Sequence, residues 1–435
     1  MIVIGLVIGM GIFRTSRDAA QAALTPAIFF AAWIIGGMVA LCGALTYAEI
    51  GSRYPVTGGY YKIFSYAYHP SIAFAINCII LISNAASLSG VALIGSEYIS
   101  PLIFKSGVND FVKALVAMGA IILFYGVNLM GLRMSSKTQN VLMLFKISML
   151  LVIIAALFFP QFYNTNSQPI VNPQVQSFGA ILLSFGVALK ATSFTYGGYQ
   201  QTINFGDEIN NPRRTIPRGI TIGILIIITL YLLVSYSYYK VIGFSELKID
   251  DPNSPGIAAI VAEKMFGPTG RYISSILLFV AVLAYVNVLL LSNPRVMYAM
   301  SEDGILPASF RKKDEKKDVL TVSLSVFAAT CVVVLFFAKK FEEILSFTIF
   351  LDSIGMATSA ATIFILRKKT RHLNGKGIYS MKLYPLMPLI FITTYIFVGI
   401  MIGIENWRYA VVGLSVLAAF LLIYFATKKI RNQKS

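Results

Sequence analysis

The chain has 435 residues, of which 57 % are hydrophobic and only 13 % are charged. A typical soluble domain is roughly 25 % charged, and a soluble chain of this length needs far more polar surface to cover its core. This composition excludes a soluble enzyme, a coiled coil and a disordered protein. The formal net charge of +17 is typical of basic loops at a membrane surface, and we expect no nucleic-acid partner.

Apolar runs of about 18 residues or more recur along the chain, which is typical of a protein that crosses a bilayer many times. Because lipid offers backbone groups no hydrogen-bonding partner, each span is expected to be a helix. The sequence thus predicts an all-α membrane protein with twelve transmembrane helices. Their expected ranges are 2–23, 26–50, 71–104, 111–132, 141–162, 178–205, 219–243, 272–300, 319–338, 344–366, 383–404 and 409–426.

The basic residues are distributed unevenly between the two sets of loops. With the N-terminus inside, the inner loops and the C-terminal tail hold about twice as many Lys and Arg residues as the outer loops, so the positive-inside rule places both termini in the cytoplasm. The first span is short before its glycine pair. The eight residues before Gly9 reach only about 12 Å at ~1.5 Å per residue, less than half of a ~30 Å core, so we expect the natural chain to extend beyond Met1.

Two spans contain glycine pairs near their middle. Gly9 and Gly11 lie in the first span, and Gly197 and Gly198 lie in the sixth. Glycine inside a helix costs about 1 kcal/mol relative to alanine, so both spans are expected to break there. An unwound turn presents free N–H groups at one half-helix and free C=O groups at the other, and these suit the two charges of a zwitterion. Corresponding breaks in two halves indicate a transporter site; the alternative is that the glycines only allow close helix packing.

Other kinds of site have little support in the sequence. The three Cys and two His residues lie apart from one another, so we expect no disulfide, metal or cofactor. The absence of a phosphate-binding loop excludes a nucleotide-driven pump. A membrane-embedded enzyme would need Asp, Glu or His residues clustered at one membrane face, and no such cluster is present. A sensor without transport is a further alternative, in which substitution of Gly11 or Gly197 would leave the function intact.

Several motifs occur in the same order as in a known transporter family. They are GMGIF at 9–13, AEIGSRYPVTGG at 48–59, FTYGGY at 194–199, NFGDEI at 204–209, SNPR at 292–295 and GILP at 304–307. Together they resemble the amino acid–polyamine–organocation transporters, and in particular the L-type branch and its bacterial serine/threonine exchanger relatives. That branch also carries a lysine in its fifth span, where Lys146 stands.

The resemblance implies a fold of two inverted repeats of five helices each, with broken first and sixth helices and two further helices at the C-terminus. The first repeat would occupy residues 1–162, the second 178–366, and the last two spans with the tail 383–435. It also implies a secondary transporter, and not an enzyme, that carries amino acids across the plasma membrane by alternating access.

Family site residues can be placed on this sequence through the matching motifs. The carboxylate of the substrate would lie at the backbone N–H groups of the first break, its α-amine at carbonyl groups near both breaks, and Phe194 would close over it. The expected substrate-binding residues of the two breaks are therefore Val7, Ile8, Gly9, Met10, Gly11, Phe194, Gly197 and Gly198. Lys146 would occupy the place of the sodium ion of sodium-coupled relatives, which implies sodium-independent transport.

The sequence departs from the family pattern in two places that bear on function. Met10 stands where the family usually has Ser or Thr, which removes a hydroxyl group near the substrate carboxylate. The loop from Lys105 to Asp110 lacks the cysteine that joins eukaryotic relatives to a heavy subunit. We therefore expect no disulfide-linked partner and a monomer or weak homo-oligomer.

A few charged residues lie within or next to the spans. Asp352 falls inside the tenth span, where a lone carboxylate is costly; it is expected to bind a polar or cationic substrate group or to carry a proton, with a structural hydrogen bond as the alternative. Lys190 could pair with Asp352, guard the outer vestibule or extend toward the membrane surface. At the inner end, the expected gate consists of Phe194, Glu49, Arg53, Asp207 and Glu208, with Arg213 nearby; simple solvation of these loops is the alternative.

The substrate stays open between two classes at this point. Met10 and the aromatic lid favour neutral L-amino acids, whereas Asp352 favours a polar or cationic amino acid or a polyamine, carried together with protons.

Overall fold

The computed structural model describes residues 2–104, 109–164, 177–249, 256–337, 341–373, 375, 377–405 and 407–432, without the side chains of 2, 207, 337, 341–345, 373 and 427–432. This part of the chain is built of helices and contains only two isolated β-bridges outside them. The helices are α1 (Ile2–Val7), α2 (Gly11–Ala22), α3 (Pro26–Arg53), α4 (Gly59–Ala67), α5 (Pro70–Ile103), α6 (Asp110–Leu129), α7 (Leu132–Ala155), η1 (Ala156–Phe158), η2 (Pro160–Phe162), α8 (Phe178–Tyr196), η3 (Tyr199–Asn204), η4 (Gly206–Glu208), α9 (Pro212–Val241), α10 (Phe244–Leu247), α11 (Ile257–Glu302), η5 (Ala308–Arg311), α12 (Thr321–Phe337), α13 (Phe341–Lys369), η6 (Arg371–Leu373), α14 (Leu386–Glu405) and α15 (Trp407–Asn432).

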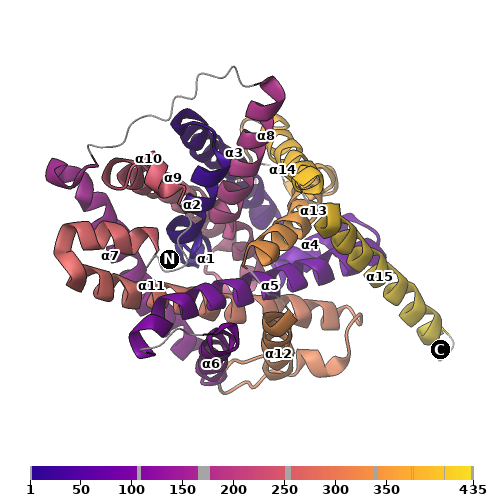
Figure 1. The fold of residues 1–435 in the computed structure, drawn as a ribbon. Helices are drawn as coiled ribbons and strands as arrows, with labels where there is room; N and C mark the ends of the chain where they lie inside the picture. The colour runs from indigo at the N-terminus through magenta and orange to yellow at the C-terminus, as the bar shows by residue number, and fades with distance from the viewer. Residues whose placement is uncertain are drawn as a thin grey trace.

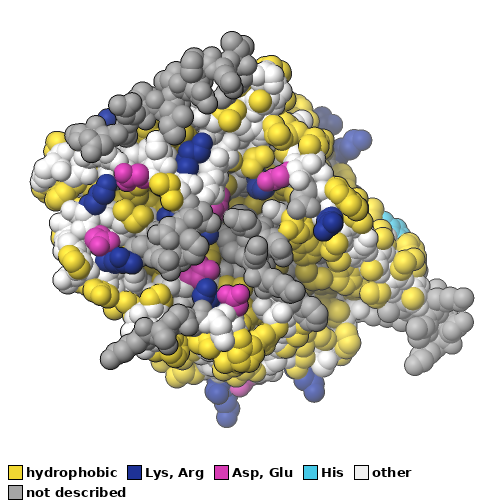
Figure 2. Space-filling model, in the orientation of Figure 1, with side chains coloured by type: hydrophobic (Ala, Val, Ile, Leu, Met, Phe, Trp, Pro, Cys, Tyr) yellow, Lys and Arg dark blue, Asp and Glu magenta, His cyan; other side chains and the backbone are white. Residues whose placement is uncertain are grey.

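Ten of the described helical segments are long and apolar enough to cross a membrane, and Thr321–Phe336 is a shorter apolar helix. Many of their hydrophobic side chains face outward, as expected when lipid surrounds the protein. Figure 2 shows such side chains gathered over α14 and α15. Within α15 the exposed residues include Leu414 and Leu422, with 52 % and 71 % of their surfaces accessible. The chain is thus a multi-pass membrane protein.

The long helices pack in two neighbouring groups. In one group α3 contacts both α8 and α9, and α2 packs along α8; in the other, α5 contacts α11, α12 and α13. The short α1 lies between the groups, against α9, α11 and η3. Figure 1 shows the N-terminus near the middle of the molecule and α15 projecting from its edge. The interior between the two groups is where the candidate site lies.

Helix starts follow ordinary capping chemistry. Thr25 precedes Pro26 at the start of α3, and its side chain accepts a hydrogen bond from the N–H of Ile28. Ser177 caps α8 by accepting one from the N–H of Ala180. A side-chain oxygen at this position satisfies one of the N–H groups that a helix start leaves unpaired, and proline at the first helical position loses no hydrogen bond.

Two segments differ from the sequence prediction. The fifth span was expected from residue 141, but α7 begins at Leu132, and two polar side chains of its first turns, Ser135 and Gln139, are buried. Asn287 of α11 lies there, donating from Nδ2 to Oε1 of Gln139 at 2.9 Å and accepting at Oδ1 from Nδ2 of Asn128, also at 2.9 Å. The expected span 272–300 belongs to the longer α11, which bends at Gly267 with a φ of 68°. The polar residues of α7 before residue 141 therefore belong to an interhelical contact and not to a loop.

Candidate substrate-binding site

Both glycine pairs interrupt their helices. α1 ends at Val7 and α2 begins at Gly11, and α8 ends at Tyr196 before η3 begins at Tyr199. At the second break Gly198 has a φ of 114°, a conformation that glycine adopts without steric strain. Its N–H donates to Oε1 of Gln200 at 2.9 Å.

The two breaks touch each other. A Cβ atom on Gly198 would lie 2.3 Å from the carbonyl oxygen of Leu6, at the end of α1. On the other side, a Cβ atom on Gly11 would lie 2.8 Å from Cα of Thr195 in α8. Thr15 of α2 completes this contact, because its hydroxyl pairs with that of Thr195 and donates to the carbonyl of Gly11 at 2.7 Å. Glycine is required at both positions because the two backbones approach so closely.

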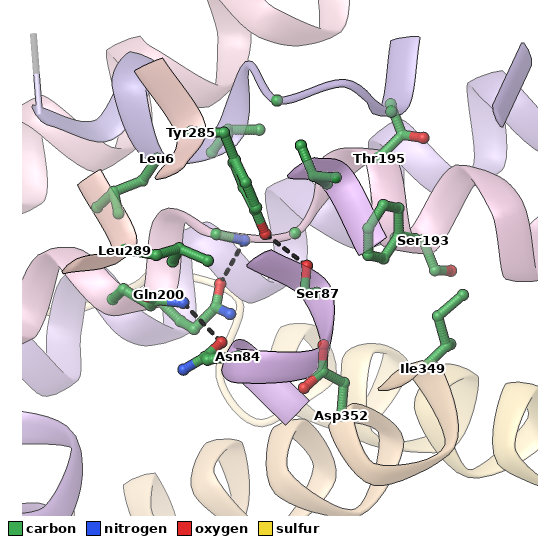
Figure 3. Close-up of a pocket in the computed structure, with 18 of the residues that line it drawn as sticks. Leu6, Asn84, Ser87, Ser193, Thr195, Gln200, Tyr285, Leu289, Ile349 and Asp352 are labelled. Carbon is green, nitrogen blue, oxygen red and sulfur yellow. Dashed lines mark hydrogen bonds between the residues drawn. The ribbon is translucent and has the colours of Figure 1, made fainter. Parts of the chain in front are cut away.

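A cavity of about 40 Å³ lies at this junction. Figure 3 shows it from within, with side chains of α5, α11 and α13 facing the two breaks. Its wall consists of Leu6, Val7, Gly9, Met10, Gly11, Asn84, Ser87, Val91, Ser193, Phe194, Thr195, Gly197, Gly198, Gln200, Gln201, Tyr285, Leu289, Ile349, Asp352, Met356 and Tyr395. A cavity of this volume holds only a few water molecules. Admitting an amino acid therefore requires the broken turns or the facing helices to move.

Seven of the eight expected residues of the breaks line the cavity, from Val7 to Gly198. The exception is Ile8, which is fully buried and outside the lining. Its carbonyl oxygen accepts a hydrogen bond from Nζ of Lys146.

Lys146 itself is fully buried on α7 and lies behind the first break. Among the described side chains, no carboxylate is within ion-pair distance of it, so the carbonyl at the end of α1 is its polar partner. The carbonyl end of a helix carries partial negative charge, which favours a cation. The lysine thus holds the unwound turn through this carbonyl and is not among the residues that line the cavity.

Asp352 lies in the middle of α13, a continuous helix, and lines the cavity. Its Oδ1 accepts from the hydroxyl of Ser83 on α5 at 2.6 Å. Among the described residues, no Lys or Arg belongs to the cavity wall. The suggested pairing of Lys190 with Asp352 is wrong: Nζ of Lys190 lies 2.6 Å from Oε2 of Glu405, at the end of α14.

The cavity wall also contains polar side chains that were not among the expected site residues. Tyr285 of α11 covers Gly9 and shares a 2.7 Å hydrogen bond with Ser87. Gln201 donates to Oδ1 of Asn84 at 3.0 Å, while its own Oε1 is buried without a hydrogen-bond partner. The sequence signal for these residues was their polar character deep inside apolar spans. Polar residues at such depth also form interhelical hydrogen bonds, so this signal does not distinguish a binding site from a structural contact.

The residues expected at the inner gate form two separate ion-pair clusters. Glu49 of α3 is fully buried. It accepts from Nε of Arg53 at 2.7 Å, from Arg367 of α13 at 2.8 and 2.7 Å, and from the N–H of Met381 at 2.8 Å. Arg53 lies on α3 itself, and the other three charge-assisted hydrogen bonds hold α3 to α13 and to the segment before α14.

Glu208 forms the second cluster, and its partner is Arg295 of α11 instead of the nearby Arg213. The two side chains make a bidentate pair, with distances of 2.7 and 2.9 Å. The guanidinium group also lies 4.5 Å above the ring of Phe205. The side chain of Asp207 lies outside the described part of the structure.

A protein-family model described as amino acid permease matches residues 1–429 of the chain. The chain belongs to this family. The permease is 26 % identical over 434 residues to the serine/threonine exchanger SteT of Bacillus subtilis (strain 168), an alignment that covers 98 % of this chain and 95 % of that protein. It is 27 % identical over 310 residues to the b(0,+)-type amino acid transporter 1 of Mus musculus, covering 70 % of this chain and 61 % of the relative. With the human cystine/glutamate transporter it shares 24 % identity over 379 residues, covering 85 % and 72 %.

Family membership makes the chain a membrane transporter of the amino acid permease type and not an enzyme. The sequence resemblance to amino acid–polyamine–organocation transporters is confirmed at the family level.

Proposed function

We propose that this permease exchanges neutral L-amino acids across the plasma membrane by alternating access, independently of sodium and with both termini in the cytoplasm. The observation that carries the proposal is the contact between the two broken helices, which together form much of the wall of one cavity. A serine/threonine exchanger that matches nearly the whole chain adds support for small neutral substrates.

The proposed architecture has twelve spans in two inverted repeats of five and two further helices. In this assignment α1 and α2 form the broken first span, and α8 and η3 form the broken sixth span. The equivalent positions of the breaks support the repeat, because each would begin one set of five spans.

In the proposed binding mode, the N–H groups of Gly9, Met10 and Gly11 hold the substrate carboxylate, and carbonyl groups at Val7, Phe194 and Gly197 hold the α-amine. The start of α2 provides the partial positive charge and the end of α1 the partial negative charge that a zwitterion needs. Lys146 takes the place of a coupling sodium ion, since its ammonium already binds the carbonyl of Ile8.

The proposed inner gate consists of the clusters of Glu49 with Arg53 and of Glu208 with Arg295, together with Phe194 as the lid and Asp207. The first cluster joins α3 to α13 through Arg367, and the second joins η4 to α11, so at least one must open when the cavity faces the cytoplasm. We further propose that the permease works as a monomer or weak homo-oligomer without a disulfide-linked partner; its cysteines, Cys42, Cys78 and Cys331, are buried or half-buried.

Asp352 favours a second candidate substrate class. A carboxylate in a cavity wall without a basic side chain is stabilised by a cation, so a cationic or polar amino acid or a polyamine, carried with protons, is the alternative. Competition separates the two classes. For a neutral-substrate site, excess alanine suppresses labelled serine uptake and lysine does not; for a cationic site lysine suppresses it, and Asp352→Asn removes that suppression.

Reconstitution into liposomes tests the main proposal. Vesicles loaded with unlabelled serine are expected to accumulate labelled serine far above empty vesicles, because exchange couples the two movements. Vesicles without protein provide the background. Absence of flux for every amino acid tested would overturn the proposal, and equal uptake into loaded and empty vesicles would overturn exchange.

A further inference from the structure

An open crevice lies at the basic end of α13, far along that helix from the substrate cavity. It has a volume of about 630 Å³ and is lined by Phe364, Ile365, Arg367, Lys368, Lys369, Arg371 and Tyr384. The lining combines two chemistries: apolar and aromatic side chains where α13 is still inside its apolar stretch, and basic side chains where that stretch ends.

The floor of the crevice is fixed by aromatic and cationic stacking. The rings of Phe364 and Tyr384 lie 5.6 Å apart, and the guanidinium group of Arg367 lies 3.7 Å above the Tyr384 ring. Arg367 is also held by Glu49. Because Glu49 is fully buried and already bonded to Arg53, it does not neutralise the outer part of the crevice.

The rim carries uncompensated positive charge. Lys368 and Arg371 are exposed, and neither forms an ion pair with a described carboxylate. Lys369 is exposed as well, but its Nζ donates to the carbonyl of Tyr66 at 2.6 Å and lies 4.5 Å above the ring of that tyrosine. These contacts orient the lysine but leave its charge in place.

An apolar surface continues from the crevice along the neighbouring helix. Leu383 and Leu386, at the start of α14, have 55 % and 53 % of their surfaces exposed, and Leu389 follows one turn later at 45 %. A ligand that fits this surface needs a negative head for the basic rim and a hydrocarbon body for the leucines.

We propose that this crevice binds an anionic phospholipid, with the phosphate between Lys368 and Arg371 and one acyl chain along the exposed leucines of α14. The depth of the crevice fits a phospholipid, because the basic rim lies where α13 leaves its apolar stretch, at the level of lipid headgroups. The charge of the rim fits as well, because basic pockets at this level attract anionic lipids. The site is separate from the substrate cavity, so it does not depend on the proposed transport activity.

The test titrates dioleoyl phosphatidylglycerol against the purified full-length permease in a neutral detergent and follows lipid binding by native mass spectrometry. Each Lys or Arg near such a headgroup contributes about five-fold in affinity. The double variant Lys368→Gln/Arg371→Gln is therefore expected to bind the lipid about 30-fold more weakly than the wild type. Both residues are exposed, so the fold is expected to be retained; gel filtration and uptake of labelled amino acid verify this.

The matched control is Arg311→Gln/Lys312→Gln, which removes the same charge from exposed positions at the end of η5 and should bind as the wild type does. Phosphatidylcholine and free glycerol phosphate complete the comparison, and neither should compete with phosphatidylglycerol. Equal loss in both double variants would overturn the site, since net charge alone would then explain binding. Competition by free glycerol phosphate would overturn the assignment to a membrane lipid, and equal binding of phosphatidylcholine would overturn recognition of the negative charge.

Discussion

The contact between the two broken helices makes Gly198→Ala a sensitive test of the site. The added Cβ would lie 2.3 Å from the carbonyl oxygen of Leu6, whereas ordinary van der Waals contact begins near 3.4 Å. The end of α1 must therefore retreat by about 1 Å. The φ of 114° adds about 1–3 kcal/mol of backbone strain for a residue with a side chain. Both effects act on the turn that carries the proposed substrate contacts.

The initial rate of serine exchange in proteoliposomes measures the consequence. A misplacement of about 1 Å in a preorganised site costs on the order of 100-fold in rate, so we expect a loss of this size per folded protein. Melting temperature in detergent is recorded in parallel to separate lost function from lost folding. Gly119→Ala in α6 is the control, because no atom lies within 4 Å of its added Cβ. Exchange by Gly198→Ala within two-fold of wild type, with unchanged melting, would refute the close contact of the breaks.

Three further predictions concern coupling and stability. Replacing external sodium by choline should leave uptake unchanged, because the Lys146 ammonium already binds the Ile8 carbonyl; a strict sodium requirement would contradict its proposed role. Glu49→Gln leaves Arg53 and Arg367 without their carboxylate, and breaking a buried ion pair in this way costs about 3–5 kcal/mol, seen as a lower melting temperature. Its control, Lys313→Gln, removes an exposed pair with Asp318 and should cost less than about 1 kcal/mol; similar losses in both variants would argue against a special role for the buried cluster. Asn287→Leu should destabilise by about 1–3 kcal/mol for each buried partner left unpaired, and unchanged melting would mean that the polar contacts of α7 with α11 contribute nothing.

The class of the protein followed from the sequence because it depends on local chemistry. Long apolar runs can cross a bilayer only as helices, and a glycine pair weakens the helix that contains it. The positions of both breaks are visible without any tertiary information. The start of α7 was not predicted because its first turns contain polar residues. In the sequence, a polar residue that is buried between helices looks the same as one that is exposed in a loop.

The partners across the interior were decided only by the tertiary structure. The sequence placed Glu208 near Arg213, but the fold brings it to Arg295, which lies much further along the chain. It also brings Lys190 to Glu405 and leaves Asp352 with Ser83. Tyr285 faces Gly9 for the same reason. Such pairs are set by how whole helices pack, and that packing depends on the shapes of all the side chains between them, so composition and motif spacing identify the residues of this site but not their arrangement.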